Sequence, residues 1–211
     1  MAYRCPVCDL VLPAGRPCPN YWCRREDRGF DVVWAIAAHQ GGLRRAIAGL
    51  KYRGELRWAR PLGLLLARFL MEHSPWFDDV DLIVGAPGNV GRARPVDHTR
   101  RILGAAEPVV GGLWAMDVAR PVLVKRAETR PMVDTPSAAL RRLWAAVELR
   151  AALVVTDCRA VQGRRVLAVD DVFTDGSTLR EVALALLGAG AVSVSGLVLA
   201  RQPIGGSGAR A

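Results

Sequence analysis

The chain has 211 residues, of which 51% are apolar and 23% are charged. This length suits one ordinary domain with a small appendage, and the composition is that of a globular protein rather than a disordered one. The net charge of +9 favours anionic partners such as phosphates, nucleic acid or an acidic lipid surface, without choosing among them. Most of the 29 basic residues are arginines, and they form no dense run. A GC-rich genome explains this abundance of arginine better than phosphate binding does.

The first residues lack the apolar core of a secretory signal, and we expect a cytoplasmic protein. One stretch, 182–200, runs for 19 residues without a charge and is long enough to reach across a bilayer. It contains Gly188, Gly190 and Gly196, and its pattern changes midway from helix-like to β-branched alternation. We therefore expect a helix, a glycine turn and a strand here, and no membrane span.

Residues 1–28 contain four of the five cysteines, in two closely spaced pairs separated by nine residues. A segment this short cannot bury a core of its own, so something must hold it together. Disulfides and free thiols are alternatives, but the cytosol keeps thiols reduced, and two such pairs can present four thiolates to Zn²⁺. We expect a structural zinc knuckle with no open position for catalysis. Its ligands would be Cys5, Cys8, Cys18 and Cys23.

Helical and strand patterns alternate through the rest of the chain, 29–204, which predicts an α/β domain with a mostly parallel sheet flanked by helices. The expected helices are 42–53, 56–72, 99–106, 137–149 and 177–187. The expected strands are 81–86, 121–125, 166–170 and 192–200. Residues 205–211 form a short Gly/Ser tail that we expect to be disordered.

The most informative stretch follows the strand 166–170, which delivers Asp170 and Asp171 to its carboxyl end, where open α/β sheets bind ligands. A short loop then opens a helix. Its amides, hydroxyls and permissive glycine can surround a phosphate, while a carboxylate reaches a sugar hydroxyl or Mg²⁺. The loop residues are Thr174, Asp175, Gly176, Ser177 and Thr178. An N-capped helix after a strand is the plainer alternative, but this combination of acids, hydroxyls and glycine favours a ligand site.

The pattern closely resembles the phosphoribosyl diphosphate signature of type I phosphoribosyltransferases: an apolar run, Asp-Asp, two residues, then Thr-x-Gly-x-Thr. The resemblance implies the type I phosphoribosyltransferase fold, with Asp170 and Asp171 as catalytic residues that hold the ribose hydroxyls directly or through Mg²⁺. It implies that 174–178 surround the 5′-phosphate and that the loop after strand 81–86 meets the pyrophosphate. That loop contains Ala86, Pro87 and Gly88. The implied reaction is displacement of pyrophosphate at the anomeric carbon by a nitrogen nucleophile.

The whole layout, from Cys5 to Arg201, resembles the ComF competence family. The resemblance rests on the four cysteines, Leu50-Lys51-Tyr52-x-Gly54, a strand with a Pro loop, the signature, and the terminal Leu199-Ala200-Arg201. Lys51 and Tyr52 alone are weak evidence, since they could simply close a helix. Members of that family are phosphoribosyltransferase-like and are associated with the handling of incoming single-stranded DNA in transformable bacteria.

The sequence departs from the family pattern at three places. An Arg-Gly-Phe-Asn-Gln run is replaced by 94–98, an Arg…Thr…Gln pattern ends in Met132, and an Asn-Leu-Arg-Gly-Ala-Phe run is replaced by 148–153. These departures leave the 5′-phosphate half of the site intact and put turnover in doubt more than ligand binding. His98 could contact an acceptor, but we expect an ordinary surface histidine, and we expect Cys158 to be inert.

Three functions compete on this evidence. The first is a ComF-like protein that binds phosphoribosyl diphosphate with Mg²⁺ and transfers phosphoribosyl to a nitrogen acceptor. The second is a non-catalytic accessory in DNA uptake, with single-stranded DNA and uptake proteins as partners. Tyr21 and Trp22 beside Arg24 and Arg25 would then stack on bases, unless the two aromatics instead pack the knuckle against the main domain. The third is a sensor that binds phosphoribosyl diphosphate and catalyses nothing.

Overall fold

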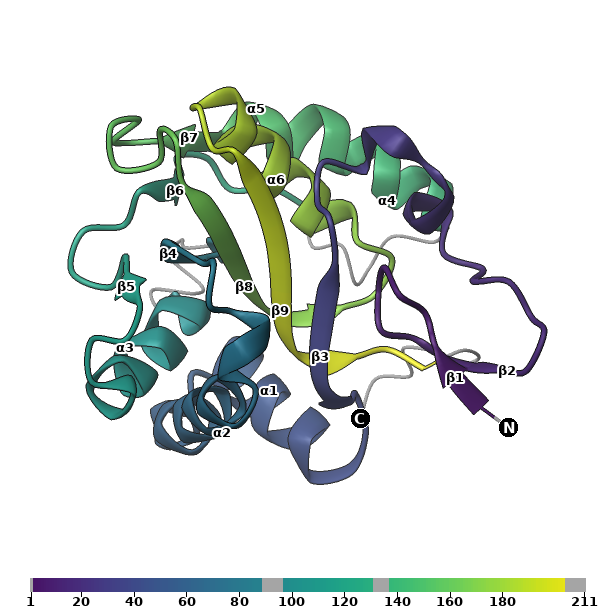
Figure 1. The fold of residues 1–211 in the computed structure, drawn as a ribbon, viewed down its shortest axis with the longest axis horizontal. Coiled ribbons are helices and arrows are strands. Elements are labelled where there is room, and N and C mark those ends of the chain that lie inside the picture. The colour runs from purple at the N-terminus through teal and green to yellow at the C-terminus, as the bar shows by residue number, and fades with distance from the viewer. Residues whose placement is uncertain (1, 89–96, 131–136, 204–211) are drawn as a thin grey trace.

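The computed structural model describes residues 2–88, 97–130 and 137–203 (Figure 1). Its centre is a five-stranded sheet in the order β3–β9–β8–β4–β5, in which every neighbouring pair is parallel. The strands are β3 (Val33–Ala38), β4 (Leu82–Gly85), β5 (Ala115–Met116), β8 (Arg165–Phe173) and β9 (Ser193–Arg201). The predicted α/β class with a parallel sheet is confirmed.

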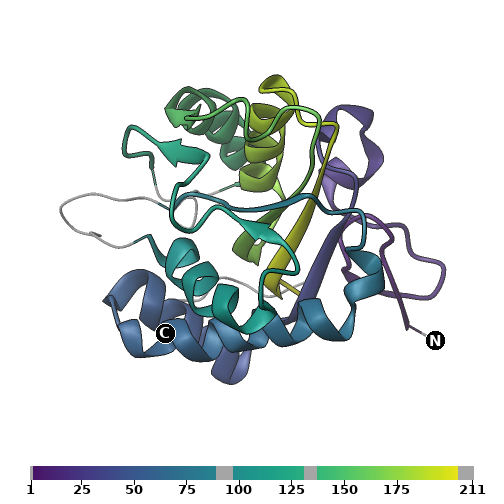
Figure 2. The same cartoon turned by 60° about the vertical axis from the view of Figure 1, so that its left-hand side comes forward.

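Helices cover both faces of this sheet (Figure 2). One face carries α1 (Gly41–Arg53), α2 (Ala59–Glu72) and α3 (His98–Val110). The other carries α4 (Ala138–Trp144), α5 (Arg150–Ala152) and α6 (Ser177–Gly188). A π-helical stretch, Ala145–Leu149, joins α4 to α5, so the helix predicted at 137–149 runs three residues further than expected. The helix predicted at 99–106 likewise runs four residues further, to Val110, and the remaining predicted helices are confirmed.

Burial on both faces explains why β8 has an almost continuous apolar run. Successive side chains of a strand point to opposite faces. Val166 and Ala168 lie in the core beneath α6, whereas Leu167 and Val169 lie in the core beneath α1, α2 and α3. A parallel sheet covered on both sides therefore has no polar face, and the run continues until the two carboxylates of the signature.

The sequence pattern did not predict β3. It did predict the strand at 121–125, but not that this strand lies outside the central sheet. β3 is an edge strand, and the cysteine segment covers its outer side: the Val33 N–H donates to the Val7 carbonyl at 2.8 Å. The Ala35 N–H donates to the Asp9 carboxylate at 3.0 Å. The strand predicted at 121–125 is β6 (Leu123–Lys125), which pairs antiparallel with β7 (Leu153–Val155) in a separate small sheet.

The cysteine segment packs on the main domain rather than standing apart. It begins with a hairpin of β1 (Ala2–Arg4) and β2 (Val11–Pro13). Cys5, Cys8 and Trp22 belong to the same buried cluster as the residues beneath α6. The segment is the purple trace on the right of Figure 1.

No helix in the described parts of the chain is long and apolar enough to cross a membrane. The uncharged stretch 182–200 divides into α6 and β9, with Gly190 at a positive φ between them, as the sequence predicts. The predicted tail, 205–211, lies outside the described residues.

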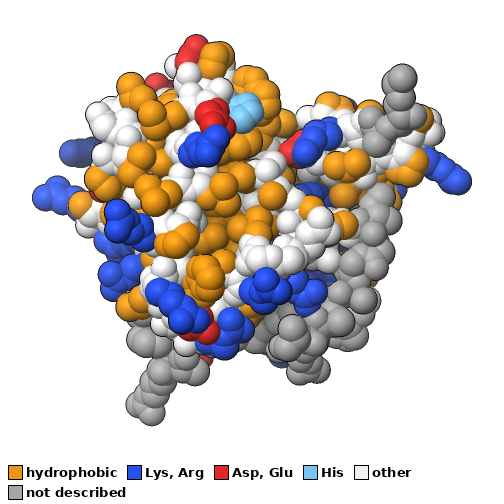
Figure 3. Space-filling view, turned by 90° about the horizontal axis from the view of Figure 1, so that it is seen from below, with side chains coloured by type: hydrophobic (Ala, Val, Ile, Leu, Met, Phe, Trp, Pro, Cys, Tyr) orange, Lys and Arg blue, Asp and Glu red, His pale blue; other side chains and the backbone are white. Residues whose placement is uncertain are grey.

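The face seen from below, which carries α1 and α2, is partly apolar (Figure 3). Its exposed large side chains include Leu64 and Met71 of α2 and the nearby Trp76. Lys and Arg side chains are scattered over this face and do not gather in one patch. The view therefore gives no sign of a dense basic surface on this side.

Candidate functional site

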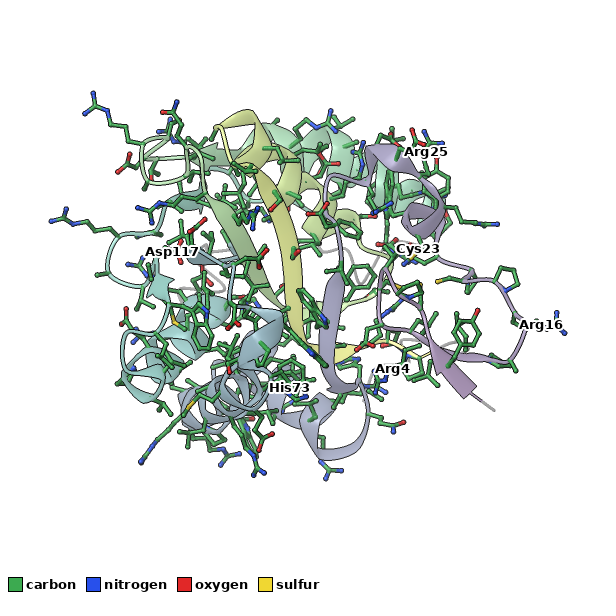
Figure 4. All side chains as sticks on the ribbon, viewed as in Figure 1. Arg4, Arg16, Cys23, Arg25, His73 and Asp117 are labelled. Carbon is green, nitrogen blue, oxygen red and sulfur yellow. The ribbon has the colours of Figure 1, made fainter. Side chains whose placement is uncertain are left out.

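The four cysteines of the N-terminal segment come together. Their sulfurs lie within 4.8 Å of one another, and those of Cys8 and Cys18 are 3.7 Å apart. A tetrahedral site with Zn–S distances of about 2.3 Å places its sulfurs about 3.8 Å apart. The cluster therefore has the size of a tetrathiolate metal site. Cys23, labelled in Figure 4, lies on the inner side of the segment, whereas Arg16 lies at its outer tip. Cys158 is exposed and stands apart from the cluster.

The four thiols influence one another's ionisation. The hydrogen bond with Cys23 and the charge of Arg201 lower the pKa of Cys8 to about 5. Burial raises the pKa of Cys18 to about 11, and the hydrogen bond with Cys8 raises the pKa of Cys23 far above its ordinary value. One thiolate thus opposes ionisation of its neighbours. All four can ionise together only around a bound cation, which is what a structural metal supplies.

The signature carboxylates lie inside β8, not after its end, and they have different surroundings. Asp171 is buried, and its carboxylate contacts two basic side chains. The Lys51 Nζ lies 2.9 Å from Oδ1 and 2.7 Å from Oδ2, and the His98 Nε2 lies 2.9 Å from Oδ2. Lys51 comes from the last turn of α1, so it does more than close that helix. Asp170 is half-buried, and its Oδ1 accepts the Asp171 N–H at 2.8 Å.

These surroundings shift the two carboxylates in opposite directions. Burial would raise the pKa of Asp171, but Lys51 and then His98 hold that pKa well below its usual range. Burial, followed by the negative charge of Asp171, raises the pKa of Asp170 to about 7. Asp171 is therefore an internally neutralised anion. The charge of Lys51 lowers the pKa of Asp170 only in part, and Asp170 keeps one oxygen that it does not use for the Asp171 N–H.

The expectation that His98 is an ordinary surface histidine is wrong. His98 is only 6% exposed and is the first residue of α3, where it contacts Asp171. Its ring packs so closely on Gly88 that a Cβ at that position would lie 2.9 Å from the imidazole. His98, Asp170 and Asp171 also form a cluster of metal-ligating types, although Lys51 already supplies a cation at Asp171.

The predicted pyrophosphate loop lies beside the signature. It follows β4, the neighbour of β8, and the Ala86 N–H donates to the Val169 carbonyl at 2.8 Å. Ala86 is buried, while Pro87 and Gly88 are half-buried. The structure thus brings 86–88 and the two carboxylates to one edge of the sheet. Among the departures from the family pattern, 94–96 and Met132 lie outside the described residues.

The predicted phosphate loop, 174–178, has its carbonyls tied down on one side. The Phe173 and Thr174 carbonyls accept from the Arg201 Nη1 at 3.0 and 2.8 Å. The Asp175 carbonyl accepts from the Asn20 Nδ2 at 3.1 Å. Every peptide bond described is trans, so the N–H groups of Thr174, Asp175 and Gly176 point the other way. Within the described residues, these three N–H groups have no protein acceptor.

Glycine is required at the turn of this loop. Gly176 has a φ of 88°, and a Cβ there would lie 2.6 Å from the Phe173 ring. The next residue, Ser177, begins α6 and has a buried Oγ with no hydrogen-bond partner among the described residues. Free amides, a buried hydroxyl and a helix start together form a set of donors suited to an anion.

Two other side chains of the loop have different positions. The Asp175 carboxylate accepts the Ser177 N–H at 3.0 Å and pairs with the Arg141 Nε of α4 at 3.0 Å. It is therefore already bound by protein groups at the start of α6. Thr174 is exposed and Thr178 is half-buried. Sequence reasoning missed Arg141, since nothing in its neighbourhood marks it as a partner of a residue 34 positions away.

Of the two alternatives for Trp22, packing is the one observed. Trp22 is 7% exposed, and the Arg180 guanidinium lies 4.4 Å from the centre of its ring. Tyr21 is more exposed, with Arg142 at 4.3 Å and Arg25 at 5.5 Å from its ring centre. Trp22 therefore fixes the cysteine segment to α6, and base stacking is left to Tyr21.

The sequence matches no protein-family model, and no curated protein is significantly similar to it. Any assignment therefore rests on the residues themselves. What they form is a parallel sheet with a half-buried carboxylate of raised pKa, an adjoining loop of amides without acceptors in the described residues, and a separate four-cysteine cluster at its edge.

Proposed function

We propose that this protein binds phosphoribosyl diphosphate and that it is a ComF-like member of the type I phosphoribosyltransferases. The proposal rests on the signature 170–178. One observation carries it: three consecutive N–H groups, those of Thr174, Asp175 and Gly176, lack acceptors within the described residues, and they lie between β8, which contains Asp170, and the start of α6. A phosphate with a ribose attached needs this combination of amide donors and a neighbouring carboxylate acceptor.

The two signature acids have separate roles in this proposal. Asp170 accepts the ribose hydroxyls, since its carboxylate is half-buried and keeps one oxygen that the Asp171 N–H does not use. Asp171 fixes Lys51 and His98, and through His98 it holds the Gly88 end of the pyrophosphate loop. Asp171 is thus a positioning residue here, rather than a second ribose ligand.

Mg²⁺ enters this proposal only with the ligand. In proteins it is usually held by one or two carboxylates together with substrate phosphates, and Asp170 is the acid here with a free oxygen. Bound Mg²⁺ would supply charge neutralisation for departing pyrophosphate. The chain's own part is to hold the 5′-phosphate at 174–178 and to place the pyrophosphate near 86–88. A nitrogen nucleophile would then displace it at the anomeric carbon.

Isothermal titration of Mg²⁺–phosphoribosyl diphosphate into the zinc-loaded full chain tests the proposal. We expect micromolar binding, and we expect Asp170→Asn to weaken it more than about tenfold, because charge-assisted hydrogen bonds to the ribose are lost. Asp81→Asn is the matched control, since Asp81 precedes β4 at the other end of the sheet and should leave affinity unchanged. Absence of binding in the folded parent chain would refute the proposal.

A turnover assay then separates the enzyme from the sensor. Pyrophosphate release is followed with nucleobases and amines as acceptors, at ligand concentrations that saturate the titrated site. Release that requires an acceptor identifies a transferase. Binding without release for any acceptor identifies the non-catalytic sensor.

The cysteine cluster forms part of the same proposal as a structural Zn²⁺ site. Four thiolates with no further protein ligand close the coordination sphere, so the metal would hold the segment and not take part in the reaction. Zinc analysis of the purified chain should give one ion per chain. Replacement of Cys8 by Ser should abolish it.

Single-stranded DNA handling is the alternative, and one observation keeps it. Tyr21 is exposed, and the guanidiniums of Arg25 and Arg142 lie against its ring. The ring could stack on a base while the guanidiniums contact phosphates. Binding of labelled single strands should then fall steeply with added salt and should weaken in Tyr21→Ala. Salt-insensitive binding would contradict this alternative.

A further inference from the structure

Arg201, the last residue of β9, connects the cysteine cluster with the phosphate loop. Its guanidinium is 6% exposed and lies 4.6 Å from the centre of the Phe173 ring. On one side, Nε donates to the Cys8 carbonyl at 3.1 Å and Nη2 lies 3.6 Å from the Cys8 sulfur. On the other side, Nη1 donates to the carbonyls of Phe173 and Thr174.

This buried charge has no carboxylate partner within the described residues. The carbonyls that accept from this guanidinium, those of Cys8, Phe173, Thr174 and Gln202, offset part of the cost of burying it, and a nearby anion would stabilise the charge further. The nearest candidate is the cysteine cluster. When four thiolates bind one divalent metal ion, the complex retains excess negative charge, and the Cys8 sulfur lies against the guanidinium.

The same guanidinium determines which way the phosphate loop faces. In a trans peptide unit the carbonyl and the N–H point in opposite directions. By holding the Phe173 and Thr174 carbonyls, Arg201 turns the N–H groups of Thr174 and Asp175 to the opposite side. Asn20, which lies between Cys18 and Cys23 in the cysteine segment, does the same for Gly176 through the Asp175 carbonyl.

We propose that the metal-loaded cysteine cluster is the counterion of Arg201 and that, through Arg201 and Asn20, it holds the loop 173–176 with its amides facing the ligand. Arg201 is a positioning residue in this scheme. Loss of the metal leaves the guanidinium without its anion and releases the loop carbonyls. The state of the cysteines then controls anion affinity at a site that contains no cysteine.

The coupling between cluster and loop can be measured without any ligand. Amide hydrogen exchange is compared in the zinc-loaded full chain and in the same chain after chelation. The amides to follow are those of Ser177 and Arg180, which donate to the Asp175 carboxylate and to the Gly176 carbonyl of the loop. We expect their exchange to rise at least about tenfold, the factor for about 1.4 kcal/mol of lost hydrogen bonding, while amides of α2 and α3 keep their rates. An unchanged loop, a uniform rise over the whole chain, or a chain that takes up no Zn²⁺ would overturn the proposal.

Substitution of Arg201 gives the second measurement. Arg201→Gln should raise exchange at Ser177 and Arg180 by a similar factor while one zinc per chain stays bound. Arg201→Lys, which keeps the charge but not the fork of donors, should lie between Gln and the parent. Arg165→Gln is the matched control, since Arg165 begins β8 at the far end and pairs with exposed Asp79. If Arg201→Gln affects all of β8 and β9 equally, Arg201 has only a structural role. If it does not fold, the chelation experiment decides.

The effect on ligand affinity rests on the proposed function, whereas the coupling of cluster and loop does not. Because coupling between two sites is reciprocal, phosphoribosyl diphosphate should tighten zinc retention by the same factor by which zinc tightens ligand binding. Chelator competition with and without the ligand measures this factor. If the parent chain binds no phosphoribosyl diphosphate, the proposed function fails while the exchange experiment still decides the coupling. If it binds with equal affinity before and after chelation, the coupling fails and the proposed function stands.

Discussion

The cysteine cluster and the acid cluster of β8 are built alike but neutralised differently. In each, ligating side chains from separate segments lie within 4.8 Å of one another. The four thiols cannot all ionise without an external cation. At Asp171, in contrast, Lys51 already supplies positive charge from within the protein, and the His98 Nε2 lies 2.9 Å from the same carboxylate. At Asp170 the charge of Lys51 offsets burial only in part, and the pKa stays raised.

The two clusters differ in what neutralises their negative charge. At the cysteines, every ligand faces inward, so a metal completes a closed structural unit. At the acids, the protein satisfies one carboxylate and leaves its neighbour for a ligand. Four substitutions test this distinction, and their expected effects on the free energy of unfolding decrease in the order given.

The largest effect is expected at the cysteines. Cys8→Ser removes a fully buried ligand of the metal, and because metal binding is folding free energy for such a segment, we expect a loss of at least about 5 kcal/mol. Urea denaturation of the zinc-loaded chain measures it. Cys158→Ser, at an exposed position, should change stability by less than about 0.5 kcal/mol. Equal effects would mean that the cluster holds nothing together.

Lys51→Met should have the next largest effect. It leaves Asp171 buried with His98 as its only basic partner, and breaking a buried ion pair in this way costs about 3 kcal/mol. Removing the charge as well, in Lys51→Met/Asp171→Asn, should restore part of the stability. A double variant no more stable than Lys51→Met would show that the ion pair is not what Lys51 contributes.

Asp170→Asn should stabilise the protein at neutral and alkaline pH. The pKa of Asp170 is raised to about 7 in the folded state, so its contribution to stability is present below its unfolded pKa and is lost as the pH rises through about 7. Relative to the parent, the variant should gain on the order of 2 kcal/mol between about pH 4 and pH 8. Denaturation curves across this range measure the gain, and a difference independent of pH would show that Asp170 is not destabilised by its surroundings.

The smallest effect is expected for His98→Gln. Glutamine can still donate an N–H to the Asp171 carboxylate, so the loss should be about 1 kcal/mol. His98→Phe removes the donor and should cost more. Thermal melting of both variants gives the order, and a reversed order would place the contribution of His98 in its packing on Gly88 rather than in its contact with Asp171.

Local patterns predicted much of this molecule. Short apolar runs predicted the sheet strands 82–85, 165–173 and 193–201 within a few residues. Gly54 predicted the end of α1, where it adopts the left-handed conformation. The cysteine spacing predicted the cluster. These features depend on residues close together in the sequence, where periodicity and turn chemistry operate.

What the sequence did not reveal depends on distant pairs. Lys51 and Asp171 are 120 positions apart, and Arg201 meets Cys8 across 193 positions. No local pattern records such contacts. The sequence therefore places His98 on the surface and assigns the same role to Asp170 and Asp171. β3 was missed because its identity as a strand comes from pairing with β9, at the other end of the chain.

The contact between Cys8 and Arg201 also bears on how the chain is made. A ribosome adds about 5 to 20 residues per second, so the cysteine segment emerges roughly 10 to 40 seconds before the strand that receives it. β3 likewise waits for β9, the strand with which it pairs in the sheet. During synthesis the cysteines are thus open to metal ions, oxidants and other chains. A segment that emerges early is secured only when β9 follows.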